Sequence, residues 1–95
     1  MSERDERLAV MQDALAKYSI GEWELGDLIR VLELHYQSIG APEQWERDFK
    51  REWGRLEEMY AFALDSDESI AALRNSAVVG EAVNRICGLL KDAGS

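Results

Sequence analysis

Apolar residues recur at helical spacing along most of the sequence, and this pattern predicts its secondary structure. Four of them fall on one face of the first segment: Leu8, Met11, Leu15 and Tyr18. A helix from about Glu3 to Tyr18, capped by Ser2, accounts for that spacing. No long segment alternates apolar and polar residues at every second position, so the sequence predicts no strand.

The second segment carries the most regular stripe. After a link through residues 19–21, apolar residues repeat every three or four positions: Leu25, Leu28, Ile29, Leu32, Tyr36 and Ile39. This spacing predicts the central helix of the core, ending at about Ile39. Val31 and Leu34 lie off the stripe, and we expect them to contact a second neighbouring helix. Exposed apolar surface is the alternative.

Gly40 and Pro42 mark the boundary between the second and third helices. Gly40 ends the second helix, and Pro42 opens the third at a position where its missing N–H costs nothing. The third helix is expected to reach Leu64, and Gly54 is the position at which it would bend. Its predicted inner face comprises Trp45, Phe49, Leu56, Met59, Tyr60 and Ala63.

Turn residues and a further apolar stripe describe the rest of the chain. Residues 65–69 form an acidic loop without apolar side chains, and residues 70–74 suit a short helical turn. A last helix is predicted from about Ser76 to Lys91. Its inward-facing residues are Val79, Val83, Ile86 and Leu90.

This order of elements predicts the fold class. It is an all-α, small antiparallel four-helix bundle, with short connections and a single domain over residues 1–95. Residues 1–2 and 92–95 are expected to fray. A three-helix core with an irregular segment before the last helix is the alternative.

Composition bounds the class of protein. With 95 residues, of which 46% are hydrophobic and 32% charged, the chain should fold alone around one modest core. A single cysteine excludes an internal disulfide, the N-terminal stretch is charged, and no apolar run approaches the roughly 20 residues that span a bilayer. We therefore expect a cytoplasmic protein with neither a cleaved signal nor a membrane anchor.

The net charge of −8 narrows the expected partners. Nucleic acids and anionic membranes are bound through Lys and Arg that neutralise phosphates, so direct binding to either is not expected. An acidic surface instead steers association with a cationic protein, although acidity also serves solubility.

The sequence carries no motif for catalysis or metal binding. Its one His and one Cys, His35 and Cys87, stand 52 positions apart, and no nucleotide-binding or hydrolase signature occurs. We expect no enzymatic activity, no metal and no cofactor. His35 then has a structural or surface role near the end of its helix, and Cys87 acts as a small buried hydrophobe.

Glu52 conflicts with the pattern of the third helix. It projects close to the middle of the stripe formed by Trp45, Phe49 and Leu56, where a carboxylate must be paired or solvated. We expect either a bend near Gly54 or an ion pair at the rim, with Arg51 or Arg55 as the partner.

Acidic residues gather at two places. Three of them, Glu22, Glu24 and Asp27, surround the start of the second helix beside Trp23. A second group follows the third helix: Asp65, Asp67 and Glu68. A solvated face would explain either group alone. Aromatic side chains inside a charged rim, however, are typical of binding hot spots, so these residues are candidates for contacting a partner.

Two segments carry a resemblance to a known family. Residues 20–29 (IGEWELGDLI), after an amphipathic first helix, resemble the segment that opens the second helix of colicin-D-type immunity proteins. Residues 56–64 (LEEMYAFAL), the acidic residues 65–68 and the last apolar helix follow in the same order. The resemblance covers most of the chain as a pattern.

The resemblance implies a cytoplasmic inhibitor that occludes the active site of a cognate basic toxin, an RNase or tRNA nuclease. Its acidic residues would mimic RNA phosphates. The matching positions are Asp65, Asp67 and Glu68, with Glu57 and Glu58 nearby.

Two other functions remain open from the sequence. One is a helical adaptor or regulatory module, which could be a homodimer through Val31 and Leu34; a monomer or weak dimer is expected for the free chain. The other is a small enzyme or ligand carrier with Glu52 or His35 in a pocket.

Overall fold

Four helices pack against one another in the protein, as the apolar pattern predicts. The computed structural model describes residues 3–66 and 70–94. Its elements, in chain order, are α1 (Glu3–Ser19), α2 (Leu25–His35), the 3₁₀ turn η1 (Tyr36–Ser38), α3 (Glu43–Asp65), the 3₁₀ turn η2 (Ile70–Asn75) and α4 (Ala77–Gly94). No strand occurs within the described residues, so the all-α prediction is confirmed.

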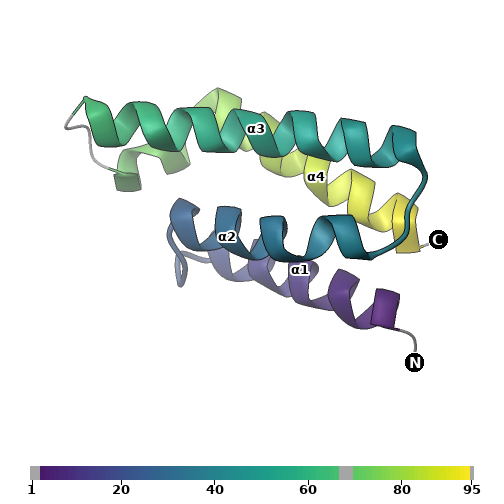
Figure 1. The fold of residues 1–95 in the computed structure, drawn as a ribbon. Helices are drawn as coiled ribbons and strands as arrows, with labels where there is room; N and C mark the ends of the chain where they lie inside the picture. The colour runs from purple at the N-terminus through teal and green to yellow at the C-terminus, as the bar shows by residue number, and fades with distance from the viewer. Residues whose placement is uncertain (1–2, 67–69, 95) are drawn as a thin grey trace.

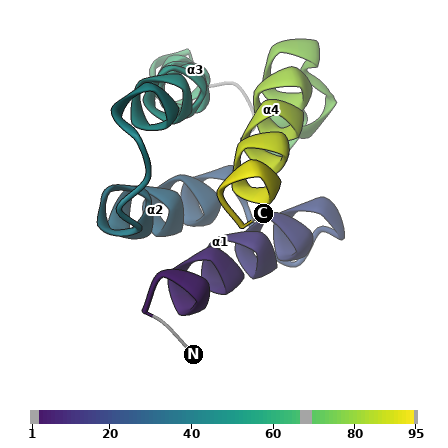
Figure 2. The same ribbon diagram turned by 90° about the vertical axis from the view of Figure 1, so that its right-hand side faces the viewer.

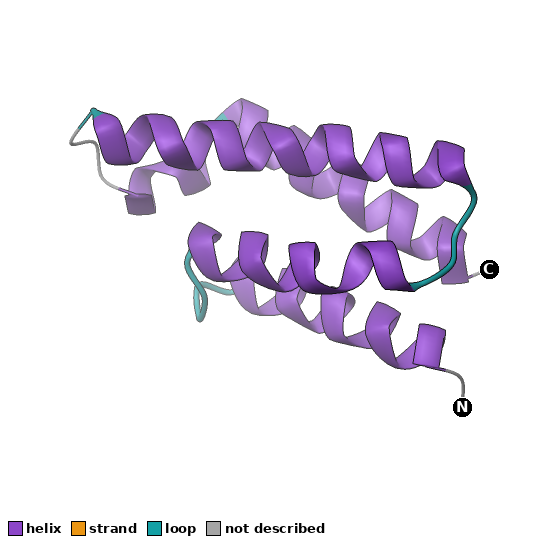
Figure 3. Ribbon diagram, viewed as in Figure 1, coloured by secondary structure: helices purple, strands orange, loops and turns teal. Residues whose placement is uncertain are grey.

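The helices alternate in direction. Figure 1 shows α1 and α3 running one way and α2 and α4 the other, and Figure 2 shows the four helices at the corners of a rough square. Each helix packs against the two beside it in that square. In Figure 3 every residue outside the grey segments is drawn as helix or loop. The antiparallel four-helix bundle is therefore confirmed.

The second helix is shorter at both ends than the sequence predicts. It starts at Leu25 because the Asp27 carboxylate accepts a hydrogen bond from the Glu24 backbone N–H at 3.2 Å, as part of a capping box. It ends at His35, and the chain tightens into η1 before Gly40 reverses it with a φ of +68°. The predicted helical end at about Ile39 was wrong, although Ile39 is buried.

The third helix has its predicted length, and the last helix is longer than predicted. α3 ends at Asp65, one position past the predicted end, and Figure 1 shows no sharp kink along it. α4 continues past Lys91 to Gly94, because Ala93 is buried and its carbonyl accepts a hydrogen bond from Arg4 Nη2 at 2.6 Å. The predicted short turn after α3 is present as η2. Ser2, the predicted cap of the first helix, lies outside the described residues.

Aromatic rings form the centre of the core between α2, η1 and α3. Phe49 stacks on Tyr36 at 4.8 Å between ring centroids and on Trp45 at 5.0 Å. Two indole N–H groups tie α3 to its neighbours: Trp45 Nε1 donates to Leu89 O at 2.7 Å, and Trp53 Nε1 donates to Ile29 O at 3.0 Å. These bonds satisfy polar atoms that burial would otherwise leave unpaired.

The off-stripe residues of α2 divide between core and solvent. Val31 packs half-buried against the core, as expected for a helix with two neighbours, but Leu34 is 65% exposed. Within the described part of the chain, no helix combines the length and apolarity needed to cross a membrane.

Gly26 and Gly54 provide a matched test of the packing of α2 on α3. A methyl group at Gly54 meets nothing within 4 Å, so Gly54→Ala should stabilise the protein by about 0.5–1 kcal/mol through helix propensity. A methyl group at Gly26 would lie 2.8 Å from Tyr60 Oη, so Gly26→Ala should lose part or all of this gain to the displacement of the Tyr60 ring. Urea unfolding measures both changes, and equal effects would contradict the close approach.

Candidate functional site

The outer side of the last three turns of α3 is an exposed surface of mixed apolar and acidic character. We call it the distal α3 surface; it comprises Glu57, Glu58, Ala61, Phe62, Leu64 and Asp65, all exposed. Phe62 is 59% exposed and Leu64 57% exposed, so two large apolar side chains lie among the carboxylates of this surface. The helix turns by about 100° per residue, so the six positions spread over its solvent side.

The three carboxylates of this surface have no protein partner within the described residues. No ion pair or hydrogen bond joins Glu57, Glu58 or Asp65 to another side chain there, whereas the carboxylates near the start of α3 pair with arginines. Asp65 also stands in the last turn of α3, which contains no basic residue. Negative charge at this end of a helix opposes the helix dipole and is locally unfavourable.

Of the acidic group predicted after the third helix, only Asp65 belongs to the described residues. Asp65 belongs to the helix itself and not to a loop. Asp67 and Glu68, the other two candidate residues of that group, lie outside the described residues.

The candidates at the start of α2 have local structural roles. Glu24 and Asp27 form the capping box of α2, and Trp23 packs half-buried against the core with Lys17 Nζ 5.0 Å from its ring centroid. Gly26 lies against Tyr60 of α3, so the start of α2 and the distal half of α3 are neighbours. Of the second predicted group, Asp65 lies on this same half of α3.

Glu52 is the one charged residue of the described chain that is buried, at 3% exposure. Its Oε1 accepts a hydrogen bond from Arg85 Nη1 of α4 at 3.2 Å and lies 3.7 Å from Arg55 Nε of its own helix. The prediction that Glu52 pairs with Arg55 is therefore confirmed, whereas Arg51 pairs with Asp48 instead. Because Glu52 is paired, no bend near Gly54 is needed to bring its carboxylate to solvent.

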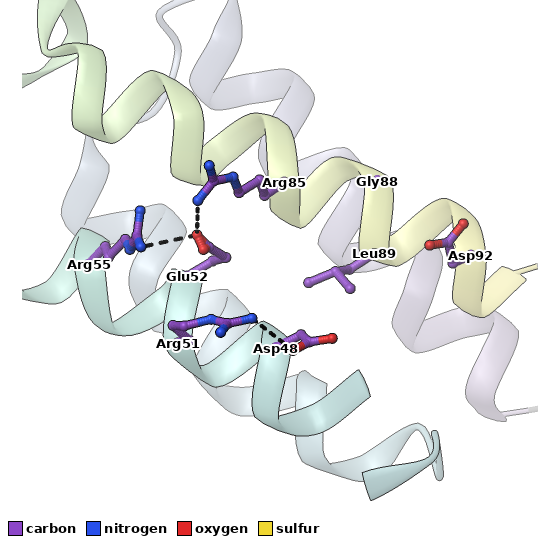
Figure 4. A pocket seen from close by; sticks show the side chains of 8 residues that line it. All are labelled: Asp48, Arg51, Glu52, Arg55, Arg85, Gly88, Leu89 and Asp92. Carbon is purple, nitrogen blue, oxygen red and sulfur yellow. Dashed lines mark hydrogen bonds and ion pairs between the residues drawn. The ribbon is translucent and has the colours of Figure 1, made fainter. Parts of the chain in front are cut away.

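These side chains line a groove of about 470 Å³ between α3 and α4 (Figure 4). The remaining lining residues are Asp48, Arg51, Gly88, Leu89 and Asp92. The groove is open to solvent along one side, and the guanidinium groups of Arg55 and Arg85 converge on Glu52 in Figure 4.

Neither His35 nor Cys87 lies beside a second catalytic group among the described residues. His35 Nδ1 lies 3.1 Å from Arg7 Nη1, and because a guanidinium can only donate, Nδ1 is the acceptor in this contact. Arg7 also pairs with Glu3 at 2.8 Å, so His35 joins a surface network between α1 and α2. Among the described residues, no group of three or more His, Cys, Asp or Glu side chains could hold a metal ion.

Cys87 lies half-buried at a second groove, between α1 and α4. It shares this groove of about 410 Å³ with Leu15, Ala16 and Lys91. Burial raises the pKa of the Cys87 thiol above its ordinary value, and the positive charge of Lys91 partly opposes that rise. A raised pKa keeps the thiol protonated and poorly nucleophilic at neutral pH.

Sequence reasoning missed Phe62, Leu64 and Arg85. Phe62 and Leu64 stand on either side of the inner face of α3, where they could have packed against a neighbour; their exposure is a tertiary property. Arg85 borders the apolar stripe of α4, but its pairing with Glu52 depends on the register of two helices whose paired residues are 33 positions apart.

Comparisons with protein-family models, with curated proteins and with solved structures found no match to this chain.

The thiol offers a pH-dependent prediction. Because the pKa of Cys87 is raised, the rate of alkylation by iodoacetamide should rise at higher pH in the folded protein than in urea. Lys91→Gln removes the opposing charge, so it should move the folded-state profile to still higher pH and leave the profile in urea unchanged. Restricted access alone would lower the plateau without moving the midpoint, and coincident midpoints would contradict this description of the thiol.

Proposed function

We propose that the protein binds a basic protein partner through the distal α3 surface and inhibits it. In its specific form, which follows the family resemblance, the protein is an immunity protein that neutralises a cognate nuclease toxin by occluding its active site. One observation carries the proposal: exposed Phe62 and Leu64 stand among three carboxylates that have no partner in the described chain.

The two kinds of side chain contribute differently to such a contact. Burying Phe62 or Leu64 in a partner removes apolar surface from water, worth about 1.5–3 kcal/mol for a fully buried side chain. The carboxylates would accept charge-assisted hydrogen bonds from Lys and Arg, which favour fast association and exclude acidic partners. Aromatic anchors with a charged rim are the usual arrangement at interface hot spots.

The position of Asp65 adds a reason for a cationic partner. A carboxylate in the last turn of α3 opposes the helix dipole by roughly 0.3–1 kcal/mol, and no neighbouring cation in that turn offsets it. Lys or Arg from a partner would remove this unfavourable interaction on binding. Locally unfavourable residues of this kind are found most often at functional sites, where contacts made on binding offset their cost.

A nuclease suits these requirements because its active site must bind phosphate. Lys and Arg in such a cleft would bind carboxylates spaced along a helix in place of the phosphates of the RNA backbone. Asp67 and Glu68 follow Ser66 in the sequence and add two acidic residues to this part of the chain.

The self-associating adaptor is the weaker alternative. It would use Val31 and Leu34, but Val31 packs against the core and Leu34 alone is a small contact. Stable interfaces bury roughly 800 Å² on each partner, far more than one leucine provides.

A pair of charge-matched variants tests the proposal. Glu58→Lys with Asp65→Lys, and Glu6→Lys with Glu33→Lys, each change two exposed carboxylates, and each reversal adds two charges, so both pairs move the net charge from −8 to −4. The tagged wild-type protein is used to capture a partner from a lysate of its own organism at low salt. The affinity of both variants for that partner is then measured.

We expect the Glu58 and Asp65 variant to lose at least about tenfold in affinity, equivalent to about 1.4 kcal/mol, and the Glu6 and Glu33 variant to lose much less. The captured partner should cleave RNA, and wild-type protein should stop the cleavage at equimolar amounts. Equal losses for both variants would mean that only bulk charge matters. A partner without nuclease activity would refute the immunity function while leaving the binding surface in place.

A further inference from the structure

The groove between α3 and α4 has two ends of opposite charge. At one end lie Arg55 and Arg85 with Glu52 beneath them, which leaves a formal charge of +1. Figure 4 shows Asp48 and Asp92 farther along the groove, toward the C-terminal end of α4.

At that second end, two carboxylates outnumber one cation. Asp48 is held by Arg51 at 2.8 Å, and Asp92 has no partner within the described residues, so the formal charge is −1. The groove is therefore electrically balanced overall and polar along its length. It fits neither a simple anion nor a simple cation.

The positive end is organised by the buried carboxylate. Glu52 is buried in the interface between the two helices. It accepts a hydrogen bond from Nη1 of Arg85 and forms an ion pair with Nε of Arg55, so it contacts one nitrogen of each guanidinium. A guanidinium carries five N–H donors, so most donors of both arginines stay free. Both side chains are about half exposed, and their free donors are available to an acceptor in the groove.

Gly88 and Leu89 line the groove between its two ends (Figure 4). Gly88 leaves open space beside Leu89, because even an added Cβ at this position would meet nothing within 4 Å. A ligand can therefore lie along the groove between its two charged ends.

From this arrangement we propose that the groove binds a short zwitterionic peptide. Its carboxylate accepts hydrogen bonds from Arg55 and Arg85, and its ammonium group donates to Asp48 and Asp92. The ligand carboxylate and Glu52 together balance the two guanidinium charges. The groove shares no residue with the distal α3 surface, so this site does not depend on the proposed inhibitor function.

The separation of the ends sets the ligand length. Arg55 is seven positions from Asp48 along α3, and Arg85 is seven positions from Asp92 along α4, which is about 10 Å of helix in each case. A free α-amino acid is too short to reach both ends. An extended tripeptide, at about 3.3–3.6 Å per residue, spans that distance.

Triglycine is the probe, and its two blocked forms are the controls. Triglycinamide lacks the carboxylate and N-acetyltriglycine lacks the ammonium group. Binding to the whole protein is followed by NMR titration of backbone amides. Wild-type protein should bind triglycine with shifts at residues lining the groove, and each blocked peptide should bind at least about tenfold more weakly.

Variants assign each terminus to its end of the groove. Arg85→Gln should reduce the difference between triglycine and triglycinamide, because Arg55 remains as the one arginine at that end. Asp92→Asn should reduce the difference between triglycine and N-acetyltriglycine. Arg47→Gln, which changes an exposed arginine outside the groove, should alter neither difference. Circular dichroism checks folding. If Arg85→Gln does not fold, Arg85→Lys replaces it, and the blocked peptides still test the wild-type protein. Absent binding, shifts outside the groove or equal affinity for all three peptides would overturn the proposal.

Discussion

The buried carboxylate of Glu52 is the constraint on which the arrangement of α3 and α4 depends. It stands on the inner stripe of α3 at 3% exposure, where an unpaired charge would cost several kcal/mol. Arg85 must approach from α4 and Arg55 from the next turn of α3 to offset that cost. The Glu52–Arg85 ion pair therefore sets the register of the two helices. It also places charged side chains at the bottom of the groove between them.

The rest of the core supports this arrangement from both sides. The Trp45 indole bonds to the backbone of α4 and the Trp53 indole to the backbone of α2, so α3 is tied to both neighbours in its first half. Beyond Leu56, the outer side of α3 carries no comparable ties, and its apolar and acidic side chains face solvent. The inner side of the same half is packed, with Ala63 fully buried and Tyr60 against Gly26, so a helix held by the core presents this outer side to solvent.

The sequence predicts the helices and core well because burial imposes a period of 3.6 residues that can be read directly. The errors have local physical causes. α2 starts at Leu25 because Glu24 and Asp27 cap it, and these are two of the residues whose charge suggested binding. α4 extends to Gly94 because Arg4 from the other end of the chain bonds to Ala93, a contact that no local pattern contains.

The candidate surfaces were harder to predict than the fold. Asp65, Glu57 and Glu58 could be chosen from charge alone, but the exposure of Phe62 and Leu64 depends on where neighbouring helices end. The groove likewise depends on a helix register. Glu52 was recognisable as an anomaly, yet its main partner belonged to a helix that sequence reasoning treated as apolar.

The most direct test of the account is a double-mutant cycle on Glu52 and Arg85. Glu52→Gln, Arg85→Met and the double variant are compared by urea unfolding at low and high salt. We expect a coupling energy of about 1–2 kcal/mol that high salt only partly reduces, because one partner is buried. Single effects that add to within about 0.5 kcal/mol would mean that the two residues are independent, and would contradict the idea that the buried carboxylate sets the register of α3 and α4.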